Sequence, residues 1–257
     1  MSGKGRVRDL LNVSLRRIAA RSAKLGELTF FPSFCKVCRC LLETPGEQVL
    51  CRPCLDKLKP HRASYCLCCG RFLEGAGEPH LCHSCLKKRP PFAVHRSCGL
   101  YRGELKDLIL LFKYRGYRVL AKPLGRFVLE SLGREESLWW GVDVIIPVPL
   151  HPKRKRQRGF NQAGALAKQL SKQKRILLED RVLRKMKNVP PQTSLEQDER
   201  AKNVKGVYAV MRREKIQGKT ILLIDDVYTT GSTLRECSRV LQRAGAKEVR
   251  AITIAQA

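Results

Sequence analysis

The stretch that decides the fold is Ile221-Leu222-Leu223-Ile224-Asp225-Asp226-Val227-Tyr228-Thr229-Thr230-Gly231-Ser232-Thr233. Its first four residues are apolar, which predicts a short strand buried on both faces, as in a parallel sheet. We expect this strand to end at the two carboxylates. Apolar residues recur at helical spacing after Thr233, so the stretch predicts a strand, a loop and the start of a helix.

The loop combines hydroxyl side chains with one glycine, and its chemistry suits a sugar phosphate. Backbone N–H groups of such a turn, together with the positive end of a helix dipole, converge on one point and can hold a phosphate. Asp225 and Asp226 instead accept hydrogen bonds from hydroxyls or hold a divalent cation through water. Ribose 5-phosphate satisfies both groups. The alternative, acids that only cap the helix, leaves one carboxylate without a use.

This stretch resembles the phosphoribosyl pyrophosphate (PRPP) loop of type I phosphoribosyltransferases. The resemblance implies that Asp225 and Asp226 bind the ribose hydroxyls. It also implies that the 5-phosphate is surrounded by Thr229, Thr230, Gly231, Ser232 and Thr233. We expect Mg²⁺ to accompany PRPP, since this ion keeps several waters and needs few direct protein ligands.

Composition adds a strong positive charge to this picture. The 257 residues include 51 Lys and Arg but only 23 Asp and Glu, for a formal net charge of +28. Such a field attracts polyanions, so nucleic acid, with single-stranded DNA as one candidate, or an anionic membrane surface is an expected partner. The alternative is that a highly phosphorylated substrate suffices. No Gly-x-x-x-x-Gly-Lys-Ser/Thr loop occurs, which disfavours nucleotide hydrolysis.

Twelve cysteines, most in Cys-x-x-Cys pairs, point to metal rather than disulfides. Two sets of four are offset by 31 positions and predict two structural zinc sites, because each knuckle presents two thiolates to a tetrahedral ion. The ligands are Cys35, Cys38, Cys51 and Cys54, and then Cys66, Cys69, Cys82 and Cys85. We favour this sequential grouping, although the spacing also permits a crossed one. Cys40, Cys68 and Cys98 are expected to be spare buried thiols.

The chain is expected to contain three parts. Residues 1–30 predict an amphipathic basic helix that packs on the protein, with a position on anionic lipid as the alternative. Residues 31–90 predict the double zinc ribbon, and residues 91–257 the phosphoribosyltransferase-like domain. There is neither a secretory signal nor an apolar run of about 20 residues, so we expect a cytoplasmic protein without a transmembrane segment.

The third part predicts an α/β fold with a parallel sheet and flanking helices. Residues 101–132 predict two helices joined by a basic turn at 113–117, which either faces the site or is simply solvated. Residues 142–148 and 247–255 predict two further strands.

A second cationic segment follows the strand expected at residues 142–148. It resembles the pyrophosphate loop of the same family, which implies that His151, Arg154, Arg158 and Gly159 bind pyrophosphate. Lys153 and Lys155 are expected to be solvated. The long polar stretch between residues 183 and 210 predicts a lid, with Gln192, Arg200 and Asn203 as its functional residues.

Three features together identify a narrower resemblance, to the ComF family of double zinc ribbon phosphoribosyltransferase proteins. They are the Cys₄ ribbons, the string Val-Pro-Leu-His-x-x-Arg-x-x-x-Arg-Gly-Phe-Asn-Gln at residues 148–162, and Gln192 followed by Arg200 and Asn203. The resemblance implies Mg²⁺-dependent phosphoribosyl transfer to an unidentified acceptor. It also implies a role in competence, with a helicase or the DNA-uptake machinery as partner. The alternative is a non-catalytic nucleic-acid-binding factor that keeps a PRPP-sensing site.

Overall fold

A computed structural model describes residues 33–42, 49–75, 77–187 and 206–257. The helix expected within residues 1–30 and the three expected lid residues lie outside these ranges. The chain divides into two compact units, residues 1–56 and 57–257. The smaller unit contains the first group of cysteines and helix α2 (Arg52–Asp56). The domain boundaries expected at residues 30 and 90 stay a prediction.

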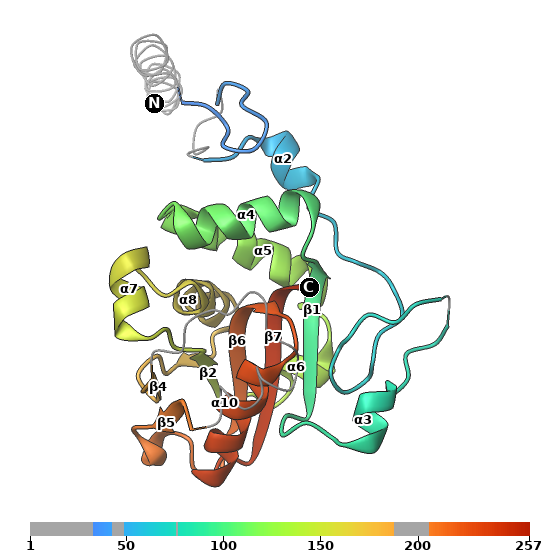
Figure 1. Ribbon diagram of the computed structural model, residues 1–257, viewed down its shortest axis with the longest axis vertical. Coiled ribbons are helices and arrows are strands. Elements are labelled where there is room, and N and C mark those ends of the chain that lie inside the picture. Colours follow the sequence, from blue (N-terminus) through green and yellow to red (C-terminus); the bar gives the residue numbers. More distant parts are fainter. Residues whose placement is uncertain (1–32, 43–48, 76, 188–205) are drawn as a thin grey trace, which may run out of the picture. The chain divides into compact units, whose positions relative to one another are not determined.

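The larger unit is built on a five-stranded parallel sheet, as the sequence predicts (Figure 1). Strands β2 and β6 lie side by side, with Pro147 opposite Ile224. The strand order is β1-β7-β6-β2-β3, and the strands are β1 (Val94–Leu100), β2 (Val144–Pro147), β3 (Leu177–Leu178), β6 (Thr220–Tyr228) and β7 (Glu248–Gln256).

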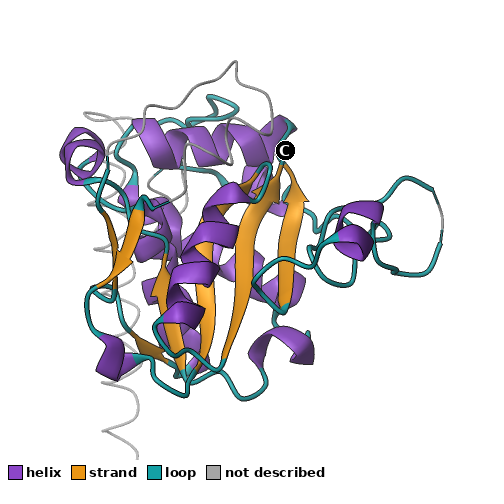
Figure 2. Ribbon diagram, turned by 60° about the horizontal axis from the view of Figure 1, so that its bottom comes forward, coloured by secondary structure: helices purple, strands orange, loops and turns teal. Residues whose placement is uncertain are grey.

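Helices cover both faces of this sheet (Figure 2). Helices α5 (Ala121–Leu132) and α8 (Gln162–Lys174) pack together, and α8 also packs on β2 and β6. Helix α10 (Ser232–Arg243) packs on β6 and β7. The other helical elements are α3 (His83–Lys87), α4 (Gly103–Tyr114), η1 (Arg118–Leu120), α6 (Glu136–Trp139), α7 (Pro152–Arg158) and η2 (Arg213–Lys215). No helix in the described ranges is long and apolar enough to cross a bilayer.

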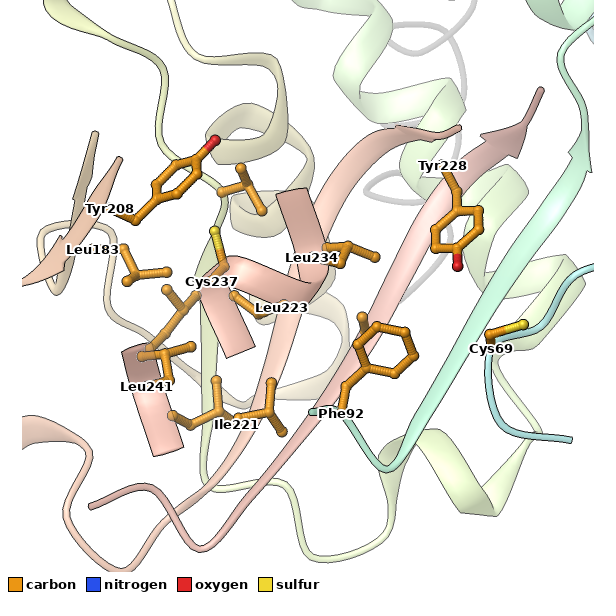
Figure 3. Close-up of a cluster of buried hydrophobic side chains, with 14 of the residues drawn as sticks. Cys69, Phe92, Leu183, Tyr208, Ile221, Leu223, Tyr228, Leu234, Cys237 and Leu241 are labelled. Atoms are coloured by element: carbon orange, nitrogen blue, oxygen red, sulfur yellow. The ribbon is translucent and has the colours of Figure 1, made fainter. Parts of the chain in front are cut away.

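The core on the α10 side joins the sheet, the helix and the second group of cysteines (Figure 3). Side chains of β6 alternate between the two faces, so Ile221 and Leu223 meet α10 residues in this cluster. Buried Cys66, Cys69 and Cys85 belong to the same cluster. The second ribbon is therefore part of the domain's hydrophobic core.

Several elements differ from the sequence-based expectation. Strand β6 does not stop at the acids but continues to Tyr228, because these residues pair with the long strand β7. Strand β1 was not predicted. The stretch expected to be a lid contains at its two ends an antiparallel hairpin of β4 (Leu183–Lys185) and β5 (Tyr208–Val210), and this hairpin packs on α10 through β5.

Candidate functional site

The two acids lie at the carboxyl end of β6, near the centre of the sheet, where ligands of open α/β sheets bind. Neither residue is fully buried. The Asp226 backbone N–H donates to Asp225 Oδ1 at 2.9 Å. Burial, followed by the charge of Asp226, raises the pKa of Asp225 from its ordinary value to about 7. The site therefore holds one carboxyl group that changes its charge near neutral pH.

The predicted turn follows directly and leads into α10. Gly231 has a φ of +76° and is the N-cap of this twelve-residue helix. A side chain there would be strained by that φ, and its Cβ would lie 2.5 Å from the Tyr228 hydroxyl oxygen. The hydroxyl oxygens of Thr230 and Ser232 are 2.8 Å apart, and the Ser232 N–H points to Thr230 Oγ1 at 3.4 Å. Strand, glycine turn and helix N-terminus thus form the expected arrangement for an anion.

Lys113 also belongs to the site. It lies in the last turn of α4, which extends over the carboxyl ends of the strands (Figure 1). Its Nζ is 2.8 Å from Asp226 Oδ1, and both side chains are mostly buried, with exposed fractions of 15% and 17%. The sequence left open whether this cation faces the site. The contact depends on packing between α4 and β6, which the local pattern does not reveal.

The expected pyrophosphate segment is a short helix, α7, rather than a loop. His151 caps it, because the Lys153 N–H donates to its ring Nδ1 at 3.3 Å, and Gly159 ends it with a φ of +78°. Arg154 and Arg158 are spaced one helical turn apart and are half-buried, whereas Lys153 and Lys155 are exposed. Arg154 and Arg158 are thus less exposed than the two lysines, and their role in binding pyrophosphate stays a prediction.

Arg158 is held against the end of α4. Its guanidinium lies 4.9 Å from the centre of the Tyr114 ring, and Nη2 is 3.4 Å from the Tyr114 hydroxyl oxygen. Nη1 donates to Gln162 Oε1 at 3.2 Å. The Asn161 side chain donates to the Val148 carbonyl at 3.0 Å and so fixes the start of α8 to the end of β2. These contacts set α7 beside the strand that neighbours β6.

The hairpin β4–β5 adds two residues that the sequence did not indicate. Burial lowers the pKa of Lys185, nearby Arg154 lowers it further, and Asp225 raises it. The Lys185 ammonium lies 5.5 Å from the centre of the Tyr208 ring. Burial raises the pKa of Tyr208; the charge of Asp225 raises it further, and that of Arg154 lowers it. The hairpin, α7 and β6 therefore share one electrostatic environment.

The eight predicted metal ligands gather in two clusters of four, grouped sequentially. Within each cluster all four sulfur atoms lie within 4.8 Å of one another. A Zn–S bond of about 2.3 Å places tetrahedral sulfurs about 3.8 Å apart. The Sγ separations of 3.8 Å for Cys35–Cys54 and 3.7 Å for Cys69–Cys82 agree with this geometry. Four thiolates leave no open position for water, so both sites suit a structural zinc ion.

The sequence predicted that the remaining cysteines Cys40, Cys68 and Cys98 are buried, and this prediction is wrong for one of them. Cys68 and Cys98 are buried, but Cys40 is exposed, and its Sγ is 3.3 Å from that of Cys38. The fourth non-ligand cysteine, Cys237, is buried in α10.

Comparison with known proteins gives a consistent result. A family model described as a phosphoribosyl transferase domain matches residues 132–257. "Competence protein F" of Haemophilus influenzae is 31% identical over 163 residues, which are 62% of this chain and 71% of that protein. "Competence protein ComFC" of Streptococcus pneumoniae is 31% identical over 160 residues, or 62% and 67% of the two chains. "DNA utilization protein YhgH" of Escherichia coli is 29% identical over 162 residues, or 62% and 70%.

A solved structure titled as the allosteric regulatory enzyme of purine biosynthesis also aligns, over 56% of this chain and 29% of that one. Its identity of 21% and TM-score of 0.37 are too low to carry an argument. The two competence proteins are more similar to this chain, at 31% identity over 163 and 160 residues. The chain belongs to the ComF family.

Proposed function

We propose that this protein binds PRPP together with Mg²⁺ and transfers the phosphoribosyl group to an acceptor. The observation that carries the proposal is the arrangement at the end of β6. Two carboxylates lie directly beside a glycine turn at a helix N-terminus, and Lys113 of α4 is in contact with one of them. Lys185 of β4 lies near enough to Arg154 of α7 and to Asp225 for both charges to act on its pKa. Acids for a diol and amides for a phosphate fit a ribose phosphate better than a simple anion.

Each group has a distinct role in this proposal. Asp225 and Asp226 accept hydrogen bonds from the ribose hydroxyls, and the turn at residues 229–233 holds the 5-phosphate. Arg154 and Arg158 lie on α7, which follows β2, the neighbour of β6. They bind the pyrophosphate through charge-assisted hydrogen bonds. Lys113 pairs with Asp226 and fixes the orientation of its carboxylate.

The reaction would break the bond between ribose C1 and a pyrophosphate oxygen, and pyrophosphate would leave with the electron pair. A bond from C1 to the acceptor forms in its place. Positive charge grows on the ribose and negative charge on the leaving group, so fixed charges on both sides lower the barrier. Mg²⁺ supplies further positive charge to the pyrophosphate. We propose that Gln192, Arg200 and Asn203 belong to a lid that excludes water.

The names of the relatives support a role in DNA uptake. Competence protein F and ComFC are named for competence, and YhgH for DNA utilization. A net charge of +28 supports contact with a polyanion, and single-stranded DNA is the proposed nucleic-acid partner. The helicase or uptake machinery with which such a protein would act stays a proposal of the same kind.

Pyrophosphate release from PRPP tests the chemistry. We expect release in Mg²⁺ buffer when single-stranded DNA or a nucleobase serves as acceptor, and none from a variant with both Asp225→Asn and Asp226→Asn. If PRPP binds but no acceptor triggers release, the protein is instead a sensor that responds to PRPP without turning it over. The high charge and the two ribbons are the features that favour this second function.

A further inference from the structure

The second ribbon is fastened to the free edge of β1. The His95 N–H donates to the Cys68 carbonyl at 2.8 Å, and Arg96 Nη1 donates to the Leu67 carbonyl at 3.0 Å. Gly70 approaches so closely that a Cβ there would lie 2.1 Å from the His95 carbonyl oxygen. The ribbon thus pairs with backbone groups that an edge strand would otherwise expose. Movement of the ribbon must therefore move β1 or break these contacts.

The His95 ring connects a cysteine of the second cluster to the middle of the sheet. Its Nδ1 lies 2.7 Å from the Cys69 carbonyl oxygen, and its Nε2 lies 3.0 Å from Thr253 Oγ1. Since a carbonyl only accepts, Nδ1 carries the proton. In the neutral ring Nε2 then accepts from Thr253, whose hydroxyl is 2.7 Å from that of Ser97. The hydrogen bonds run in one direction, from Ser97 to Cys69.

His95 also contacts Tyr228, the residue that directly precedes the turn at residues 229–233. Its ring stacks on Tyr228, with centroids 4.3 Å apart and planes 20° from parallel. Tyr228 is the last residue of β6, and its ring points into the core towards Phe92 and the Cys69 side (Figure 3). The turn closes over this ring, since a Cβ at Gly231 would lie within 2.7 Å of three of its atoms. Tyr228 therefore forms the floor of the turn.

We propose that His95 is a positioning residue that makes the shape of the 229–233 turn depend on metal in the second Cys₄ cluster. The inference rests on the proposed function, because the turn is the proposed 5-phosphate site. A bound zinc ion fixes Cys69 and its carbonyl, the carbonyl fixes the His95 ring, and the ring fixes Tyr228 beneath Gly231. Without the metal, no bond holds the four sulfur atoms together, so the Cys69 carbonyl at the start of this series of contacts is no longer fixed.

Two cysteine variants of the full-length, zinc-loaded protein test the proposal. Cys69→Ser removes a ligand of the second cluster, and Cys38→Ser removes its counterpart 31 positions earlier in the other compact unit. Each variant should lose one zinc ion by mass spectrometry. Amide hydrogen exchange over residues 228–235 should then accelerate in Cys69→Ser alone. In the same samples, calorimetric affinity for PRPP with Mg²⁺ should fall about tenfold for Cys69→Ser only.

A second pair of variants keeps the test valid if Cys69→Ser does not fold. His95→Phe keeps a ring to stack on Tyr228 but removes both ring hydrogen bonds. His61→Phe makes the same substitution at a histidine whose ring packs on Phe72 instead. His95→Phe should retain both zinc ions, accelerate exchange over residues 228–235 and weaken PRPP binding about tenfold. His61→Phe should leave both measurements within about twofold of the unaltered protein, because its ring contacts Phe72 and takes no part in the contacts between Cys69 and the turn.

The two readouts separate failure of the coupling from failure of the proposed function. Equal exchange over residues 228–235 in Cys69→Ser, His95→Phe and the unaltered protein would overturn the coupling. If exchange is faster in both variants but the unaltered protein has no affinity for PRPP, the coupling is retained and PRPP is overturned as the ligand. Faster exchange together with weaker PRPP binding supports both.

Discussion

Replacing Asp225 with Asn should stabilise the protein at pH 8, although it removes a proposed ligand group. Burial and the charge of Asp226 raise the pKa of Asp225 from 3.8 to about 7. One pKa unit corresponds to about 1.4 kcal/mol, so the ionised carboxylate lowers the free energy of unfolding by up to about 4 kcal/mol. Asn keeps the oxygen that accepts from the Asp226 N–H but loses the attraction to Lys113 and Lys185. We therefore expect a net gain of about 1–3 kcal/mol.

The sign of the pH dependence follows from the direction of this shift. Because the pKa is higher in the folded state, the folded protein binds more protons than the unfolded chain between pH 3.8 and about pH 7. Asp225 therefore lowers the stability progressively as pH rises through this window, and the effect is constant above it. Asn does not titrate, so the gain from Asp225→Asn should be about 1 kcal/mol larger at pH 8 than at pH 6.

Urea unfolding of zinc-loaded protein at pH 6, 7 and 8 measures the gain. Asp143→Asn is the matched control, since this carboxylate also accepts from a backbone N–H, that of Thr220, but is exposed and should give no comparable stabilisation. A destabilised Asp225→Asn protein, or a gain that is equal at pH 6 and pH 8, would refute the claim that Asp225 is strained electrostatically.

Three further predictions concern the turn, the ion pair and the metals. Gly231→Ala should lower the free energy of unfolding by more than the roughly 1 kcal/mol of a positive-φ position, and it should abolish PRPP binding. Gly218→Ala should lower it by only that amount, because Gly218 has a φ of +70° but open space around its Cβ. Similar free energies of unfolding for the two variants would contradict the packing argument. Lys113→Met should raise the pKa of Asp225 further, since Lys113 lowers it, so calorimetric PRPP affinity should fall at pH 7 and partly recover at pH 8.5; a loss independent of pH would refute this cause. Native mass spectrometry should find two zinc ions, and the double variant of Cys35→Ser with Cys51→Ser should lose only one, because both cysteines belong to the first cluster. Loss of both ions would contradict sequential grouping.

Sequence patterns predicted the parts whose information is local. A run such as Ile221–Ile224 has no use outside a doubly covered strand, and the structure places it in the middle of the sheet. Paired Cys-x-x-Cys spacing likewise indicated two four-cysteine clusters. Arg154 and Arg158 could be distinguished from their exposed neighbours because the segment resembles a pyrophosphate loop.

Strand β1 could not be predicted because its partners come from distant parts of the chain. Its sequence, Val-His-Arg-Ser-Cys-Gly-Leu, is too polar to indicate a buried strand, yet His95, Arg96 and Ser97 are all buried. Their hydrogen bonds go to the ribbon and to Thr253, which is more than 150 residues away. Burial of these polar groups is tolerated only because each finds such a partner.

The contacts of Lys113 and Lys185 could not be predicted for the same reason. The sequence left open whether Lys113 faces the site, and Lys185 lies in the stretch expected to be a lid. Each reaches Asp225 or Asp226 only through the packing of α4 or the hairpin on the domain. The extent of β6 beyond the acids similarly depends on the length of its neighbour β7.

Calorimetric titration of PRPP in Mg²⁺ buffer tests the central claim most directly, with the unaltered protein compared to the double variant Asp225→Asn and Asp226→Asn. The account predicts binding by the unaltered protein and none by the double variant, which should keep its two zinc ions and its cooperative unfolding. Equal affinity in both proteins would contradict the assignment of the carboxylates at the end of β6 to the ribose.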